Sequence, residues 1–332
     1  AFMTAYILPK AYIEKVGTDQ FLAHPIGAGP YKLVSYERGS RAVLEAYDGY
    51  WGPKPAIKRV VFNFAPDTSA RVAMLESGRA DVAAQIPVRD AERLKKDSKL
   101  VSKIYPYTQI FIVQLPSYVP ALQNVHVRRA MQLAINKQAL SRAFFANTAK
   151  PISVLALPGT PAYVDDVDVK YDPKAAEAEL AQAGYSPGKP LEIPFMSANG
   201  STPGDYDMAR ALVQMWSRIG IKADLQEVTL AKYMELSHSS KLTGPMLYSW
   251  DNATADPEIF AGYILNPNLP FSAWKQPELA DTFKQLSALP QAQRIAGYQA
   301  IEKKATDDAW CIPLIQSVTT IAYKKTLNLN TY

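Results

Sequence analysis

The chain has 332 residues, 48% of them apolar and 20% charged, which excludes a disordered or fibrous protein and is typical of about two globular domains. Its 36 Lys and Arg exceed its 31 Asp and Glu by five, but they form no basic stripe, so nucleic-acid binding is not indicated. A single cysteine, Cys311, excludes internal disulfides and multi-thiolate metal sites. No apolar run reaches the ~20 residues that a membrane-spanning helix needs.

The first third of the chain is predicted to be mostly sheet. Residues 31–36 and 42–47 are two short apolar runs joined by Arg38-Gly39-Ser40, which is typical of a β-hairpin. Further strands are expected at residues 58–65, 81–84, 100–105 and 109–115, with helices at 70–77 and 88–96.

Two prolines within residues 116–120 indicate a connector, and we place a domain crossing there. Helical periodicity follows, with Asn136, Asp172 and Thr229 as expected N-caps of three helices. Beyond residue 190 strands alternate with helices, which predicts a parallel sheet covered on both faces. The strands are expected at residues 191–197, 221–228, 245–250 and 312–323, and the helices at 207–219, 230–241, 279–289 and 292–306.

Ligands of open α/β sheets bind beyond the carboxyl ends of the strands, which directs attention to two loops. The loop at residues 198–206 is polar and glycine-rich, and it leads into a helix N-terminus, where an anion is favoured. The second loop begins with Asp251 and Asn252 beside Trp250, a combination suited to stacking and hydrogen bonding of a small molecule. The alternatives are a core tryptophan and a helix-capping Asp251 or Asp256, and for Asp256 we favour the cap.

No constellation of side chains indicates catalysis. His24, His126 and His238 share no ligand spacing, and Cys311 has the apolar neighbours of a buried small side chain. The chain contains no nucleophile-elbow, zinc-protease, phosphate-loop or kinase motif. The sequence therefore argues against an enzyme and indicates no cofactor and no metal site.

Six segments, taken in order, resemble the family 5 extracellular solute-binding proteins, the peptide- and nickel-type receptors of ABC importers. Together they extend over essentially the whole chain, which makes the resemblance highly specific. They are HPIGAGPYKLVSYERGSRAVLEAYDGYWGPKPAIKRVVFNF, PDTSARVAMLESGRADVA, NVHVRRAMQLAINKQAL, YDPKAAEAELAQAGY, MARALVQMWSRIGIKADLQEV and YSWDNATADPEIF.

The resemblance implies an α/β, type II-like periplasmic binding protein whose two lobes are joined by hinge strands. Lobe I is expected at residues 1–115, with its N-terminal part missing, lobe II at 116–316, and a return to lobe I at 317–332. The implied function is a monomeric, periplasmic or lipid-anchored extracellular receptor, with no enzymatic activity and no nucleic-acid partner. It would capture a peptide-like solute between its lobes and deliver it to an inner-membrane ABC permease.

The resemblance also directs attention to specificity. Dipeptide-binding relatives hold the peptide amino group and carboxylate with two charged side chains, and Ala253 and the pair Tyr206–Asp207 stand at those positions here, which argues against a standard dipeptide. Asp251 could replace the missing acid, whereas we expect Arg210 to lie on a helix surface. An opine, an oligosaccharide or a nickel chelate is the alternative solute, and a hydrolase the alternative function. The candidate ligand-binding residues are Gln109, Tyr206, Asp207, Tyr248, Trp250, Asp251 and Asn252, with Tyr107 beside Gln109 also expected to face the cleft.

Overall fold

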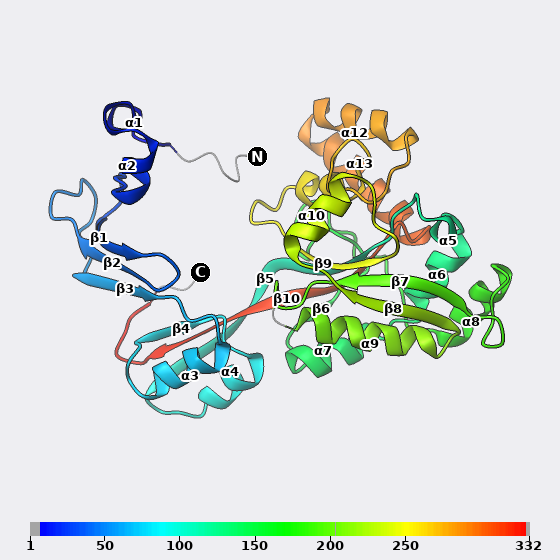
Figure 1. Cartoon of the computed structure of the whole chain (residues 1–332), viewed down its shortest axis with the longest axis horizontal. Helices are drawn as coiled ribbons and strands as arrows, with labels where there is room; N and C mark the ends of the chain where they lie inside the picture. Colours follow the sequence, from blue (N-terminus) through cyan, green and yellow to red (C-terminus); the bar gives the residue numbers. More distant parts are fainter. Residues whose placement is uncertain (1–6, 203, 330–332) are drawn as a thin grey trace. The chain divides into compact units, whose positions relative to one another are not determined.

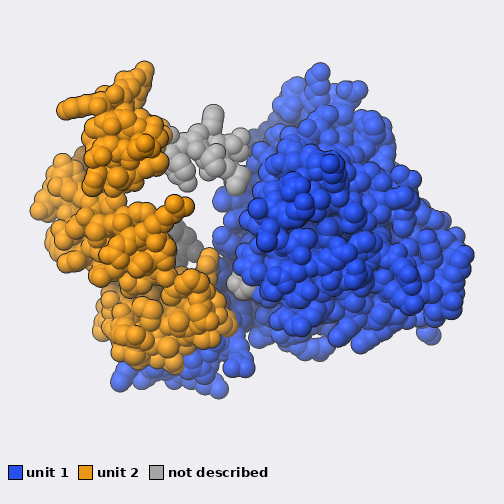
Figure 2. Space-filling model, viewed as in Figure 1, with its two compact units in different colours: residues 1, 88–321 blue, residues 2–87, 322–332 orange. Residues whose placement is uncertain are grey.

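The computed structural model describes residues 7–202 and 204–329 (Figure 1). The chain divides into two compact units, which Figure 2 colours separately: unit 1 comprises residues 88–321, and unit 2 comprises the described residues before 88 and after 321. Compactness does not define a hinge, so the lobe boundaries at 115/116 and 316/317 stay a prediction.

Unit 2 contains a three-stranded antiparallel sheet in the order β1-β2-β3, and its first two strands form the predicted hairpin. The Asp67 side chain caps the helix that follows this sheet by accepting a 2.6 Å hydrogen bond from Ala70 N. The elements of unit 2 are α1 (Lys10–Val16), α2 (Thr18–Ala23), β1 (Tyr31–Glu37), β2 (Arg41–Ala46), β3 (Arg59–Asn63), α3 (Thr68–Glu76) and β4 (Val82–Ala84).

Unit 1 is built on a sheet in the order β10-β5-β9-β7-β8, with β6 also pairing with β10, and the last residues of β10 pair with β4 inside unit 2. The β7–β8 and β7–β9 pairs are parallel, as predicted, but β5 and β9 are antiparallel, so the sheet is mixed. Its strands are β5 (Leu100–Gln114), β6 (Lys150–Pro151), β7 (Leu191–Ser197), β8 (Ile221–Glu227), β9 (Met246–Asp251) and β10 (Cys311–Lys324).

The prediction of two separate strands at 100–105 and 109–115 is wrong, because β5 runs through without a break. Pro106 lies between the two predicted strands, but a proline removes only one backbone donor. Pairing resumes directly after it, where the Thr108 carbonyl accepts a 3.0 Å hydrogen bond from Asn252 N.

Helices cover both faces of the sheet of unit 1, with α7 and α9 on one face and α12 and α13 on the other (Figure 1). Asn136, Asp172 and Thr229 each accept a hydrogen bond from a first-turn backbone N–H, which confirms the three predicted N-caps. The helices are α4 (Val88–Leu94), α5 (Pro120–Gln123), α6 (Val125–Leu133), α7 (Lys137–Phe145), α8 (Pro173–Gln182), α9 (Asp205–Ser217), α10 (Leu230–His238), the π-helical turn η1 (Glu258–Gly262), α11 (Tyr263–Leu265), α12 (Glu278–Ala288) and α13 (Gln291–Asp307).

Alternating residues of β5 belong to two different core clusters of unit 1. Phe111 and Val113 join the cluster beneath α6 to α9, where Trp216 is fully buried and donates from its indole to the Met131 carbonyl (3.0 Å). Ile110 and Ile112 face the other way, toward α12 and α13, and Cys311 belongs to this second cluster. Cys311 is buried, as predicted, and burial raises the pKa of its thiol.

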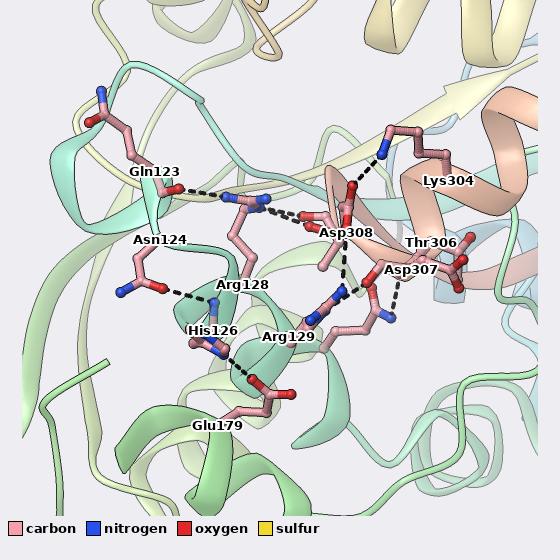
Figure 3. A network of polar contacts seen from close by, with 12 residues as sticks. Gln123, Asn124, His126, Arg128, Arg129, Glu179, Lys304, Thr306, Asp307 and Asp308 are labelled. Carbon is pink, nitrogen blue, oxygen red and sulfur yellow. Dashed lines mark hydrogen bonds and ion pairs between the residues drawn. The ribbon is translucent and has the colours of Figure 1, made fainter. Parts of the chain in front are cut away.

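Side chains of α6 satisfy backbone carbonyl groups where α13 ends (Figure 3). The last carbonyls of a helix have no partner within the helix, so they need outside donors. Gln132 donates to the Thr306 carbonyl (3.1 Å), and Arg129 to the Asp307 carbonyl (2.8 Å). Arg128 donates to the carbonyls of Asp308 and Ala309, so side chains of α6 provide the hydrogen-bond donors at the C-terminal end of α13.

Candidate functional site

The predicted ligand-binding residues all lie in unit 1, around the carboxyl end of β9, the start of α9 and the facing part of β5. Successive side chains of a strand point to opposite faces. Asp251 therefore shares a face with Gln109, its partner on β5, whereas Tyr248 and Trp250 point to the other face. The structure thus separates these candidates into two sets. The polar set contains Gln109 and Asp251 with the hydroxyl groups beside them, and the aromatic set contains Tyr248 and Trp250.

Three members of the polar set, which come from three segments of the chain, are linked by hydrogen bonds. Gln109 Nε2 donates to Ser249 Oγ (3.4 Å), and Ser249 Oγ lies 2.6 Å from Thr202 Oγ1, which joins β5, β9 and the loop before α9. The sequence did not single out Ser249 or Thr202 as site residues. Their only signal was their position, because no motif marks an isolated hydroxyl: Ser249 lies near the end of β9, and Thr202 lies in the polar loop before α9.

Asp251 is the anionic member of the polar set. Its half-buried carboxylate accepts hydrogen bonds from Tyr107 (3.2 Å) and from the hydroxyl of Thr108. Burial raises the pKa of the Tyr107 hydroxyl, and the neighbouring carboxylate raises it further. Within the described parts of the chain, no ion pair joins Asp251 to a lysine or arginine.

The N-terminus of α9 holds a carboxylate of the protein itself. Asp205 is only 7% exposed, and it accepts hydrogen bonds from the backbone N–H groups of Gly200 (2.9 Å), Thr202 (3.0 Å) and Tyr206 (2.8 Å). The anion that the sequence favoured at this helix end is therefore supplied from within the chain.

Tyr206 and Asp207 occupy the first turn of α9, on the helix surface rather than in the polar set. Asp207 is exposed and forms an ion pair with Arg210, which confirms that Arg210 lies on the helix surface. The guanidinium of Arg210 also lies over the half-buried ring of Tyr206, 5.9 Å from its centre. A direct solute contact by Tyr206 or Asp207 stays a prediction.

A small cavity adjoins the polar set. Its volume is about 20 Å³, which is room for about one water molecule. This volume is too small for a peptide-sized solute. Its lining includes Phe111, Thr202, Asp205, Tyr233, Tyr248 and Ser249.

The aromatic set is centred on Trp250, which is half-buried among Tyr248, Tyr263 and Phe271, with ring centres 5.6–5.9 Å away. The indole donates a 2.6 Å hydrogen bond to the Ile259 carbonyl. Tyr248 stacks on the buried Tyr233 at 4.5 Å, and burial raises the pKa of the Tyr248 hydroxyl. Trp250 thus combines features of a core residue and of an exposed ring, and its contact with a solute stays a prediction.

Asn252 organises the loop after β9. It is 1% exposed, and its amide donates to the Asp256 carbonyl (2.8 Å) while its oxygen accepts from the backbone N–H (3.0 Å) and the hydroxyl (2.8 Å) of Thr254. These contacts use its polar atoms within the loop, so its predicted contact with a solute remains a proposal. The Asp256 carboxylate accepts from Glu258 N (2.9 Å) at the start of η1, which confirms the predicted cap.

We expect Ala255→Gly to stabilise unit 1 by about 0.5–1 kcal/mol, because Ala255 has a φ of +57°, where an L side chain is strained and glycine is not. Differential scanning calorimetry of the two proteins measures the change. Glycine also gives the unfolded chain more conformational entropy, which opposes this stabilisation. Ala253→Gly in the same loop is the control for that entropy and should destabilise, since Ala253 does not have a positive φ. An unchanged or lower stability of Ala255→Gly would contradict the expectation.

Comparisons with known proteins identify the family. The model of the bacterial extracellular solute-binding proteins, family 5 Middle, matches residues 1–268. The chain belongs to this family. Among the described residues of this family 5 protein, no helix is long and apolar enough to cross a membrane, and no three His, Cys, Asp or Glu side chains gather as metal ligands would.

Curated relatives of this family 5 chain bind different solutes. The dipeptide-binding protein of Escherichia coli K12 is 30% identical over 262 residues, which are 77% of this chain and 49% of the relative. Heme-binding protein A of Haemophilus influenzae is 27% identical over 76% of this chain and 46% of the relative. The glutathione-binding protein GsiB of Shigella flexneri is 28% identical over 98% of this chain and 65% of the relative. The chain thus spans about half the length of the first two.

Solved structures confirm the predicted fold. The periplasmic binding protein DppA of Helicobacter pylori, in complex with the peptide STSA, aligns with a TM-score of 0.81 at 20% identity, over 97% of this chain and 64% of that one. NikA of Brucella suis, in complex with Fe(III)-EDTA, aligns with a TM-score of 0.83 at 21% identity, over 93% of this chain and 66% of NikA. The chain therefore has the α/β fold of the two-lobed periplasmic binding proteins.

Proposed function

We propose that this chain is the solute-binding part of an ABC importer receptor, which captures a peptide or peptide-like solute and delivers it to an inner-membrane permease. The observation that carries the proposal is the polar set at the strand ends of unit 1, in a chain that belongs to a solute-binding family. The receptor is proposed to be monomeric, to act in the periplasm or as a lipid-anchored extracellular protein, and to use no cofactor, nucleic acid or catalytic step.

Capture requires no bond to be made or broken. A solute held at strand ends shifts a population of open and closed forms toward the form that binds it more tightly. Hinge closure of two lobes is the usual motion of such receptors, and closure removes water from the polar contacts. The permease would then distinguish loaded from empty receptor by shape.

The polar set favours a solute group that donates hydrogen bonds, and an ammonium best of all. A carboxylate has about four acceptor positions, and the hydroxyls of Tyr107 and Thr108 use two of those on Asp251. The α9 N-terminus already holds Asp205, so it offers no vacancy to a solute carboxylate. We therefore propose that Asp251 accepts the amino group of the solute, and that Gln109 and Ser249 bind a neighbouring polar group.

Thermal shift measurements test the receptor function. The probes are the peptides Met-Leu and STSA, glutathione, an opine, an oligosaccharide and a nickel–histidine chelate. A solute at 100 times its Kd stabilises the folded chain by about 2.7 kcal/mol, which raises Tm by about 5–10 °C for a unit of this size. A rise with a peptide supports the proposal, and a rise with only another class transfers the receptor function to that class. Melting that no probe changes, or a peptide recovered cleaved, contradicts it.

We expect Asp251→Asn to weaken binding of a free-amine peptide by about 10- to 100-fold, the effect of losing one charge-assisted hydrogen bond. Isothermal titration calorimetry with Met-Leu and N-acetyl-Met-Leu measures it, and the acetylated peptide should lose little further affinity in the variant. Glu192→Gln is the matched control, because Glu192 is an exposed carboxylate paired with Lys222 on β8. Equal loss of affinity in both variants would contradict a contact at Asp251.

A further inference from the structure

An arginine on α13 is tied to the loop that follows β9. Arg294 Nη1 donates to Asp256 Oδ2 (3.0 Å), and Nη2 donates to Asp256 Oδ1 (2.6 Å) and to Glu258 Oε2 (2.9 Å). The Arg294 side chain is only 16% exposed, and its guanidinium lies 5.3 Å from the centre of the Tyr298 ring. Two parallel bonds to one carboxylate fix the orientation of both groups, which a single exposed ion pair does not.

Arg294 neutralises two carboxylates that lie close together. Partial burial raises the pKa of Asp256, but hydrogen bonds from Arg294 and from Glu258 N lower it more, so the pKa lies below its ordinary value. The same contacts raise the pKa of Arg294. Without the guanidinium, the carboxylates of Asp256 and Glu258 would repel each other across a short loop.

The loop held by Arg294 is joined to the candidate site at two points. The Asp256 carbonyl accepts from the buried Asn252 amide, and Asn252 N in turn donates to the Thr108 carbonyl on β5, beside Asp251. The Ile259 carbonyl, one residue beyond Glu258, accepts from the Trp250 indole. Ala255, which has a strained φ, directly precedes Asp256, so the loop needs outside contacts to keep its shape.

We propose that Arg294 is a positioning residue of the solute site. It contacts neither the polar set nor the Trp250 ring, and it acts by fixing residues 252–259, which place Asp251 and the Trp250 indole. The inference rests on the receptor function proposed above. Helix α13 contributes no predicted ligand-binding residue. Through Arg294 it would nevertheless keep the site at the strand ends ordered before a solute binds.

Arg294→Met tests this, because methionine keeps much of the aliphatic length and removes the charge. We expect hydrogen exchange at residues 252–260 to accelerate at least 10-fold, exchange in β7 and β8 to stay unchanged, and affinity for the probes Met-Leu, STSA and glutathione to fall about 10-fold. Arg294→Lys should lie between wild type and Arg294→Met. Lys303→Met is the matched control, since Lys303 lies on the same helix in an exposed pair with Asp166.

Three results would overturn the proposal. Unchanged exchange at 252–260 in Arg294→Met would show that the arginine does not hold the loop. Exchange that accelerates throughout unit 1 would make Arg294 a general stabiliser of the fold. Unchanged affinity for a probe that wild type binds would separate the loop from the solute site. If the wild-type protein binds none of the probes, that result counts against the receptor function and therefore against a solute site that Arg294 could order. The hydrogen-exchange data would still decide whether Arg294 holds the loop.

Discussion

We expect Arg128→Met to lower the free energy of unfolding of unit 1 by about 3–5 kcal/mol, because several buried carbonyl groups lose a charged donor at once. Arg128 is 5% exposed, and its guanidinium donates four hydrogen bonds at 2.9–3.1 Å. All four acceptors are backbone carbonyls, those of Leu122, Gln123, Asp308 and Ala309. Figure 3 labels two of these acceptor residues, Gln123 and Asp308. Methionine would leave these carbonyls without this donor, and each buried unsatisfied group costs about 1–3 kcal/mol.

The shape of the guanidinium explains why lysine should not replace it. Arg128 also stacks on Trp274, 4.8 Å from the ring centre, and donates to carbonyls on two sides. A lysine ammonium is a compact point charge without the planar fork that these contacts need. Burial lowers the pKa of Arg128 to about 10, so it stays charged at neutral pH. Urea denaturation should therefore rank Arg128→Lys between wild type and Arg128→Met, with the more exposed Arg129→Met costing about 1 kcal/mol. A loss below 1 kcal/mol in Arg128→Met would contradict this explanation.

We expect Glu302→Gln to destabilise unit 1 by about 2–4 kcal/mol at pH 5. Glu302 is 1% exposed, and its two carboxyl oxygens accept hydrogen bonds from Leu155 N (2.7 Å) and Ala156 N (2.9 Å). A glutamine amide would direct an N–H at one of these donors, which leaves both groups unsatisfied in the core. Thermal or urea unfolding of the two proteins measures the difference.

The same residue gives the stability a pH dependence of known sign. Burial raises the pKa of Glu302 to about 7, and the two backbone donors oppose this shift only in part. The ordinary glutamate value is about 4.3. The folded chain therefore binds this proton more tightly, so the stabilisation is complete below about pH 4.3 and is lost as pH rises through about 7. The wild-type minus Glu302→Gln difference in unfolding free energy should fall across that window, and a difference that rises with pH would contradict the assignment.

Local signals in the sequence predicted most helices and strands, but the sequence did not predict contacts between distant segments. Asn136, Asp172 and Thr229 cap their helices because an N-cap depends on residues two or three positions away. Two strands were predicted where β5 is continuous, because the residues of one segment do not show how it pairs with distant strands.

The candidate site shows the same limit. The loop after Trp250 could be predicted from its composition, but the split between Asp251 and Trp250 depends on where β9 ends and how it pairs with β5. The bond between Thr202 and Ser249, 47 residues apart, depends on the path of the loop before α9. The partnership of Arg294 with Asp256, 38 residues away, likewise has no local signature in either segment.

Paired native and denaturing mass spectrometry tests most directly whether this chain is a solute receptor. The 332-residue chain is measured as purified and again after incubation with the peptides Met-Leu and STSA and with glutathione. We expect the native mass to exceed the denatured mass by a few hundred daltons, and the released molecule to carry an amino group. A native mass equal to that of the bare chain in every sample would contradict it.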